Sequence, residues 1–124
     1  MAVVYTQVGE QKVVDLIDGI SAVHLDATNA HIGWGTGAGT AAKADTALFV
    51  EATEARVAAT VSQPVADKNQ WVATMVCAGA GKTITNAGLF DALTLGILVI
   101  HGDFTGVVLA IGDKIEFTIS LEQS

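Results

Sequence analysis

The chain has little of what disulfide bonding or membrane insertion would need. Its 124 residues include a single cysteine and a single proline. Cys77 has no partner for a disulfide within the chain, and we expect it to be a buried thiol because a free cysteine packs as a small hydrophobic residue. No apolar run approaches the roughly 20 residues that span a bilayer. The N-terminus also lacks the basic start and long apolar stretch of a signal peptide.

Positive charge is also scarce, with 6 Lys and Arg against 13 Asp and Glu and a formal net charge of −7. An acidic surface repels phosphate backbones, so we expect no nucleic-acid partner. Because no apolar run is long enough to span a bilayer, we expect no membrane partner either. Hydrophobic residues make up 51% of the chain and charged residues 15%. A small domain has difficulty hiding that much apolar surface, so we expect another subunit or a partner to cover part of it.

Thirteen glycines punctuate short segments in which apolar and polar residues alternate. The clearest case is residues 115–121, where the odd positions are Ile, Phe, Ile and Leu and the even positions are polar, the pattern of a strand with one buried face. The expected strands are 20–25, 30–35, 51–62, 70–78, 82–86, 95–101 and 115–121. This spacing predicts an all-β fold of about eight strands, an antiparallel, jelly-roll-like sandwich with at most one or two short helical turns.

The length favours a single domain over residues 1–124, with residues 1–8 as an N-terminal arm. Residues 13–19 fit either a strand or one or two helical turns, and both alternatives stay open. A short helical turn is expected near Thr46–Phe49, because Asp45 can cap it. Pro64 is expected to end a strand, and Gly102–Asp103 to form a turn.

One glycine-rich segment looks like the end of a phosphate-binding P-loop, Ala80–Thr83. The motif needs a glycine where this chain has Val76, and it needs a following helix where Ile84 favours a strand. We therefore expect a turn here, with a solvated Lys82.

Residues 33–38 match a dinucleotide-binding pattern in letters only, because a Gly/Thr/Ala loop follows where a helix must begin. We expect Trp34 to pack in the interior with a partner for its N–H group. The three histidines are scattered and show neither the H-x-x-x-H nor the H-x-H spacing of a metal site: His24, His31 and His101. Because no nucleophile motif or acid pair stands out either, the sequence predicts no enzyme, no cofactor and no metal.

A series of segments resembles small virion structural proteins of tailed bacteriophages, of the capsid decoration (cement) type. The resemblance covers about residues 32–121 and is carried by segments 33–40, 45–49, 54–56, 83–91, 102–104 and 112–117. A similar pattern, with a glycine-rich turn and a Gly-Leu-Phe-Asp sequence, occurs near the start of collar-type tail-fibre proteins.

The resemblance implies a β-sandwich made in the host bacterial cytoplasm that clamps the capsid exterior. Its partners would be the major capsid protein and further copies of itself, a homotrimer being favoured over a dimer. A tail or tail-fibre attachment protein is the first alternative. A carbohydrate-binding jelly-roll module is the second, and it requires Trp34, Trp71 and Tyr5 to be exposed together.

Contacts with the capsid or with other subunits are expected at exposed loops and termini, where β-sandwiches carry their function. The candidates are Ala2, Val3, Val4, Tyr5 and Thr6 in the arm, and Trp34, Gly35, Thr36, Gly37 and Thr40 in or beside the loop 35–44. A disordered terminus and a plain connector are the simpler interpretations of these two segments. Arg56, the only arginine, either pairs with an acid across a subunit seam or lies on a solvated strand face.

Overall fold

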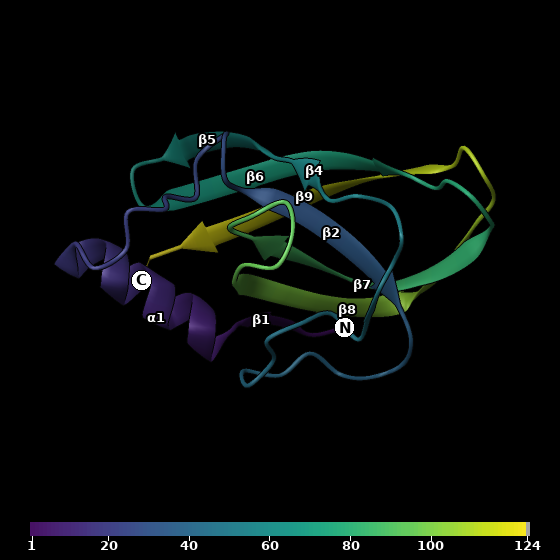
Figure 1. The fold of residues 1–124 in the computed structure, drawn as a ribbon, viewed down its shortest axis with the longest axis horizontal. Coiled ribbons are helices and arrows are strands. Elements are labelled where there is room, and N and C mark those ends of the chain that lie inside the picture. Colours follow the sequence, from purple (N-terminus) through teal and green to yellow (C-terminus); the bar gives the residue numbers. More distant parts are fainter. Residues whose placement is uncertain (124) are drawn as a thin grey trace.

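Two antiparallel β-sheets face each other, and one helix closes one end of the molecule (Figure 1). The computed structural model describes residues 1–123. The strands are β1 (Val3–Tyr5), β2 (His31–Thr36), β3 (Val50–Glu51), β4 (Val57–Ala58), β5 (Thr60–Val65), β6 (Lys68–Val76), β7 (Lys82–Phe90), β8 (Leu98–Leu109) and β9 (Lys114–Glu122). The helix is α1 (Gln7–Asp18).

The sheets differ in size, and we call them the large sheet and the small sheet. The large sheet has the order β1-β8-β7-β2-β3, with β4 also paired to β2, and the small sheet has the order β5-β6-β9. All the pairs are antiparallel, which confirms the predicted sandwich. The pairs β1–β8 and β2–β7 nest as in a jelly roll, whereas the hairpins β5–β6 and β7–β8 each stay within one sheet.

Helix α1 resolves the open question about residues 13–19, most of which are helical. Thr6 caps the N-terminus by accepting a hydrogen bond from the Gly9 amide, and Gly19 ends the helix in the left-handed conformation at φ 77°, a conformation that glycine adopts without strain. With 12 residues, the helix exceeds the one or two turns expected at 3.6 residues per turn. Among residues 1–123, no helix is long and apolar enough to cross a membrane.

Several expected boundaries are wrong. Residues 20–25 form no strand, and Thr46–Phe49 form no helical turn. The expected strand 51–62 is broken into β3, β4 and the start of β5, and Pro64 lies inside β5 rather than after it. Proline is tolerated there because β5 is an edge strand.

Gly102–Asp103 is not a turn, because β8 runs through it to Leu109. The register against β7 shifts between Ile84, which pairs with Val107, and Asn86, which pairs with Asp103. A glycine in a strand often marks such a bulge, and this bulge was mistaken for a chain reversal.

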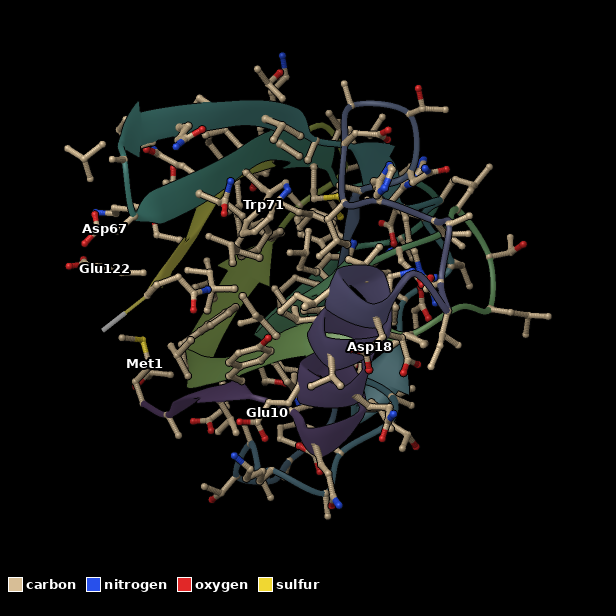
Figure 2. All side chains as sticks on the ribbon, turned by 90° about the vertical axis from the view of Figure 1, so that its left-hand side faces the viewer. Met1, Glu10, Asp18, Asp67, Trp71 and Glu122 are labelled. Atoms are coloured by element: carbon tan, nitrogen blue, oxygen red, sulfur yellow. The ribbon has the colours of Figure 1, made fainter. Side chains whose placement is uncertain are left out.

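The core lies between the two sheets. One cluster contains Ile32, Trp71 and Leu89, and a second contains Trp34, Met75 and Ile84. Figure 2 shows Trp71 pointing between the sheets towards the end that α1 closes. Cys77 is 1% exposed and belongs to the second cluster, which confirms the predicted burial of the thiol.

Candidate contact surface at the arm and the long loop

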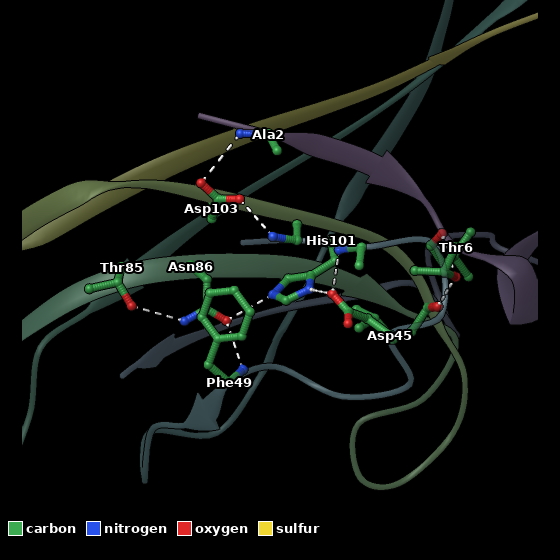
Figure 3. A network of polar contacts seen from close by, with 12 residues as sticks. Ala2, Thr6, Asp45, Phe49, Thr85, Asn86, His101 and Asp103 are labelled. Atoms are coloured by element: carbon green, nitrogen blue, oxygen red, sulfur yellow. Dashed lines mark hydrogen bonds and ion pairs between the residues drawn. The ribbon is translucent and has the colours of Figure 1, made fainter. Parts of the chain in front are cut away.

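The structure brings together the two segments that the sequence nominated separately. The loop between β2 and β3, residues 37–49, lies beside the N-terminal arm, residues 2–6. Asp103 joins them, since its carboxylate accepts hydrogen bonds from the amides of Ala2 (3.3 Å) and Ala41 (2.7 Å) (Figure 3). The Gln7 amide also donates to the Lys43 carbonyl at 2.8 Å. We call the combined residues 2–6 and 37–49 the arm–loop surface.

A buried histidine holds the end of the loop against the large sheet. His101 is fully buried on β8, and its Nδ1 lies 2.7 Å from Asp45 Oδ2 while its Nε2 lies 2.9 Å from Asn86 Oδ1 (Figure 3). Asn86 Oδ1 also accepts a hydrogen bond from the Phe49 amide at 3.1 Å. Both ring nitrogens of His101 are thus occupied by contacts with side-chain oxygens.

Asp45 is the charged partner in this network. Burial raises the pKa of its carboxyl, but hydrogen bonds from the Ala42 amide and from His101 outweigh burial, and the net pKa is lowered. Asp45 therefore stays ionised and pairs with His101. This pair anchors the loop and offers no free imidazole nitrogen for acid–base chemistry.

The start of the loop is held equally well. The Thr85 hydroxyl donates to the Gly37 carbonyl at 2.7 Å, and the Asn86 amide group donates to the Thr36 carbonyl at 3.2 Å. Gly37 has φ 92°, a conformation that suits glycine. Near the other end, Leu48 packs in a small core cluster on the large sheet. The loop is therefore pinned at both ends although it contains no regular secondary structure.

A second buried charge pair lies near the far end of the sandwich. Glu54 forms an ion pair with Lys82 and accepts hydrogen bonds from the Ala78 amide (2.9 Å) and from Trp34 Nε1 (3.3 Å). Burial alone raises the pKa of Glu54, but these hydrogen bonds outweigh it and lower the pKa to about 2. Lys82 is thus a paired side chain at 14% exposure, and the expected solvated lysine is wrong. The expected strand at this position, in place of a P-loop helix, is confirmed by β7.

Arg56 is buried rather than solvated, which corrects the expectation of an exposed strand face. Its guanidinium binds both carboxylate oxygens of Glu51, at 2.8 and 3.0 Å, within the same chain. It also donates to the carbonyls of Ala92 (3.0 Å) and Leu95 (2.6 Å), and it stacks 3.5 Å from the centre of the Phe90 ring. Its hydrogen-bonding capacity is thus used to hold the β7–β8 loop.

The candidate contact residues fall into three groups by exposure. Val3, Gly37 and Thr40 are exposed, Val3 at 66%. Ala2, Val4, Tyr5 and Thr36 are half-buried, and Thr6, Trp34 and Gly35 are buried. The Thr6 hydroxyl accepts a hydrogen bond from the Gly9 amide of α1 and donates to the Leu98 and Val99 carbonyls of β8. Of the ten arm and loop candidates, the three exposed ones can offer a whole side chain or open backbone to a partner.

The aromatic residues do not form a sugar platform. Trp34 is 1% exposed and Trp71 is 3% exposed, and the two lie in different core clusters. Tyr5 is half-buried against the first cluster. The carbohydrate-binding hypothesis therefore loses the stacking surface that it required.

Metal-ligating residues do not gather within residues 1–123, where no three His, Cys, Asp or Glu side chains are placed to hold an ion. His24 is exposed, and His31 Nδ1 lies 2.8 Å from the Asn29 carbonyl. The polar clusters of this structure thus act on the chain itself, by holding loops against the sheets.

Three residues of these polar clusters were not identified from the sequence. Asn86 directly precedes the apolar residues 87–90 of β7, and His101 directly follows the apolar residues 98–100 of β8. A polar residue at the border of a buried run is a signal that could have revealed them. Lys12 forms a buried ion pair with Asp91 at 2.9 Å. Nothing in the sequence near Lys12 indicates that pair, because its partner lies some 80 residues away.

Comparison of the chain with family models, with curated proteins and with solved structures gave no match.

Proposed function

We propose that this protein is a structural component of a tailed-phage virion that decorates the capsid exterior and stabilises it by bridging major capsid subunits noncovalently. The observation that carries the proposal is the pinned arm–loop surface. A loop of this length usually has a functional role when it is ordered, and this one is held by side chains from two strands of the large sheet.

The segments that carry the phage resemblance supply these anchors. Asn86 and Asp103 each lie in one of those segments and bind the loop, and Asp45, in a third segment, is the loop residue that contacts His101. Arg56 belongs to another of the segments and holds the neighbouring β7–β8 loop. The resemblance therefore concerns the positions that shape this face of the molecule, which supports a shared mode of contact.

Rigidity suits a protein that acts by contact. A surface that is ordered before binding loses less conformational entropy when it binds. On a shell, many copies and many weak contacts add through multivalency. The major capsid protein would contact Val3, Gly37 and Thr40, the exposed candidates of the arm–loop surface. The protein would be made in the host cytoplasm and act as a homo-oligomer.

Copy number in purified particles tests the address on the virion. Quantitative mass spectrometry should give a number of copies comparable to that of the major capsid protein. A copy number that is a small fraction of that of the shell protein would contradict capsid decoration. It would support the tail or tail-fibre attachment role, because the Gly88–Asp91 segment also resembles a pattern in collar-type tail-fibre proteins. Absence from particles would contradict both roles.

A surface variant tests the arm–loop contact. Thr40→Glu places a charge on the exposed loop and is expected to weaken binding to undecorated capsids at least tenfold, since a desolvated charge in an interface is costly. Thr94→Glu is the matched control, because Thr94 is exposed in the separate β7–β8 loop. Equal capsid binding by the two variants would contradict the assignment of the contact to the arm–loop surface.

A further inference from the structure

The edges of the two sheets are protected unequally. In the large sheet the edge strands are short: β1 has 3 residues, and β3 and β4 have 2 each. In the small sheet, β5 carries Pro64 and a register shift between Ser62 and Val65. Short strands, prolines and bulges are the devices by which proteins keep sheet edges from pairing with other chains.

β9 has none of these three protections, and charge is its only guard, in Lys114, Glu116 and Glu122. It spans 9 residues without a proline, pairs only with β6 among the described strands, and keeps one register along its whole length. Its residues alternate between exposed and half-buried from one end of the strand to the other. Its outer edge therefore presents an unbroken row of unpaired backbone groups.

The hydrogen bonds at the two ends of β9 show which of its residues direct their N–H and C=O groups away from β6. The Cys77 amide donates to the Asp113 carbonyl, and the Gln123 amide donates to the Asp67 carbonyl, both at 2.8 Å. In an antiparallel pair the bonded residues alternate, so the odd-numbered residues of β9 bind β6. The N–H and C=O groups that point away from β6 belong to Lys114, Glu116, Thr118, Ser120 and Glu122.

We propose that β9 is a homodimerisation edge, at which β9 of a second copy pairs with it antiparallel about a two-fold axis at Thr118. In that register Lys114 lies opposite Glu122 of the second copy, at both ends of the joint strand pair. Glu116 lies opposite Ser120, and Thr118 lies opposite itself. Opposite charges and paired threonines are favourable cross-strand neighbours, and every outward backbone group of the five residues finds a partner.

The neighbouring two-fold registers give less favourable pairings of the charged side chains. An axis at Glu116 places that carboxylate opposite its own copy, and an axis at Ile119 places Glu116 opposite Glu122. An axis at Phe117 leaves Glu122 beyond the pairing residues of the other strand. Like charges directly opposite are destabilising, so of these four registers only the one centred on Thr118 pairs opposite charges without opposing like charges.

The inner face of β9 favours the same partner. Phe117 and Ile119 line an apolar groove that continues over Phe104 and Met1. Figure 2 places Met1 and Glu122 on the same side of the molecule, along this open flank of the sandwich. In the Thr118 register, Phe117 of one copy lies opposite Ile119 of the other on the inner face. A second copy therefore extends the core over the groove while it extends the sheet.

The pairing does not depend on the proposed role on the capsid, because it concerns the free protein. It favours a two-fold dimer over the trimer expected from the resemblance. Its test is the oligomeric state in solution, which copy number in particles does not report.

The first test is the mass of the full chain in solution, by sedimentation velocity and native mass spectrometry over a concentration series. We expect a dimer for the natural sequence and a monomer for Thr118→Pro. The proline removes one outward N–H group and leaves all the bonds to β6 in place. Thr118→Val keeps that N–H group and is expected to remain dimeric. Circular dichroism of each variant checks that the fold is retained.

Charge exchange tests the register. Lys114→Glu and Glu122→Lys each place like charges opposite one another in a homodimer, and each is expected to weaken association roughly tenfold to hundredfold. Mixed one to one, the two variants place opposite charges at both ends and are expected to form a heterodimer. Inside each copy Glu122 also lies opposite Lys68, so the stability of the Glu122→Lys monomer is measured in parallel.

Four results would overturn the proposal. They are a monomeric natural protein at the highest concentration, a trimer, a Thr118→Pro variant that still dimerises, and a mixture of the charge variants that forms no heterodimer. The last result would leave another edge as the dimer contact and would contradict the Thr118 register.

Discussion

The two sheets of this sandwich are built by different rules. In the large sheet, residues Asn86–Phe90 of β7 and Leu98–His101 of β8 are buried without interruption, because the small sheet covers one face while the helix and the long loop lie against the rest of it. In the small sheet, β6 and β9 alternate between inward and outward residues. One sheet has two covered faces and the other has one.

Buried polar side chains follow the same division. Within residues 1–123 the buried polar residues all lie in or against the large sheet: Thr6, Lys12, Arg56, Asn86, Asp91 and His101. No buried side-chain nitrogen or oxygen in this part of the chain lacks a hydrogen-bond partner. Covering a sheet with a helix and an irregular loop brings unpaired backbone groups against it. Thr6, Arg56, Asn86 and Asp91 bind such groups, whereas Lys12 and His101 contact other side chains.

The two sheets therefore provide different kinds of contact surface and depend on different interactions for their stability. The large sheet uses polar anchors to hold segments with no secondary structure, so it shapes the arm–loop surface. The small sheet relies on one apolar face and leaves a complete edge, β9, free to pair. Changes to buried polar groups should therefore be costly in the large sheet, while matched polar changes in the small sheet should be nearly neutral.

The largest expected effect comes from the ion pair between α1 and the end of β7. Lys12→Met leaves Asp91 buried without its cation, because the two side chains are 3% and 9% exposed and lie 2.9 Å apart. Breaking such a pair from one side typically costs about 3–5 kcal/mol. Urea denaturation should show this loss in the free energy of unfolding.

The control for Lys12→Met is a lysine in an exposed pair. Lys43 lies 2.6 Å from Glu10, with the side chains 61% and 42% exposed. Exposed pairs contribute about 0–1 kcal/mol, so Lys43→Met should lie in that range. Equal losses for the two variants would contradict the view that the buried anchors carry the cost.

The same division explains which strands the sequence could predict. The expected strands 70–78 and 115–121 match β6 and β9 closely. When one face of a sheet is exposed to solvent, apolar and polar residues alternate along each strand, and this pattern is visible in the sequence. The large sheet has no such alternation. There a bulge at Gly102–Asp103 was mistaken for a turn, and the length of β7 and β8 was underestimated.

The helix was underestimated although its signals were present. Thr6 and Gly19 are an ordinary start and stop for residues 7–18. The two valines and Asp15 between them looked equally compatible with a strand, because a short apolar run does not distinguish the two periods. The packing of α1 on β8, where Gly9 leaves no room for a Cβ atom beside Val99, decided between them.

The candidate contact residues were predicted by segment better than by residue. Each of the two segments contains an exposed candidate, Val3 in the arm and Thr40 in the loop, but most of the named candidates are half-buried or buried. Trp34 and Arg56 were nominated by residue type and are instead buried against Glu54 and Glu51. Such partners are brought together by the topology, and a single sequence does not show them.

A smaller effect is expected from Asn86→Ala in the network under the loop. Asn86 Oδ1 accepts from the Phe49 amide and lies 2.9 Å from His101 Nε2. A buried donor that loses its acceptor costs about 1–3 kcal/mol, and at the lower end of that range the loss of both totals about 2 kcal/mol. Thermal unfolding measures the loss, and amide hydrogen exchange should rise at Phe49.

Asn69→Ala is the matched change in the small sheet. Asn69 is exposed on β6, and exposed substitutions usually stay within about 0.5 kcal/mol. A loss for Asn69→Ala as large as that for Asn86→Ala would remove the contrast between the sheets.

The smallest expected effect depends on pH and concerns Glu54. Its pKa is about 2 in the folded protein against an ordinary value of 4.5, so its ionised form stabilises the fold. A lowered folded-state pKa gives stability that is fully present above about pH 4.5 and is lost as the pH falls through about 2. Glu54→Gln should therefore be less stable than the natural protein by on the order of 1 kcal/mol at pH 7, and the two should converge as the pH approaches 2.

Urea midpoints measured from pH 7 down to pH 2 test this convergence. Asp67→Asn serves as the control, because Asp67 is exposed in the turn between β5 and β6; its difference from the natural protein should stay small throughout. A gap for Glu54→Gln that persists unchanged at the lowest pH would mean that its cost arises from lost packing rather than lost charge. The buried carboxylate would then not differ in kind from the apolar contacts of the small sheet.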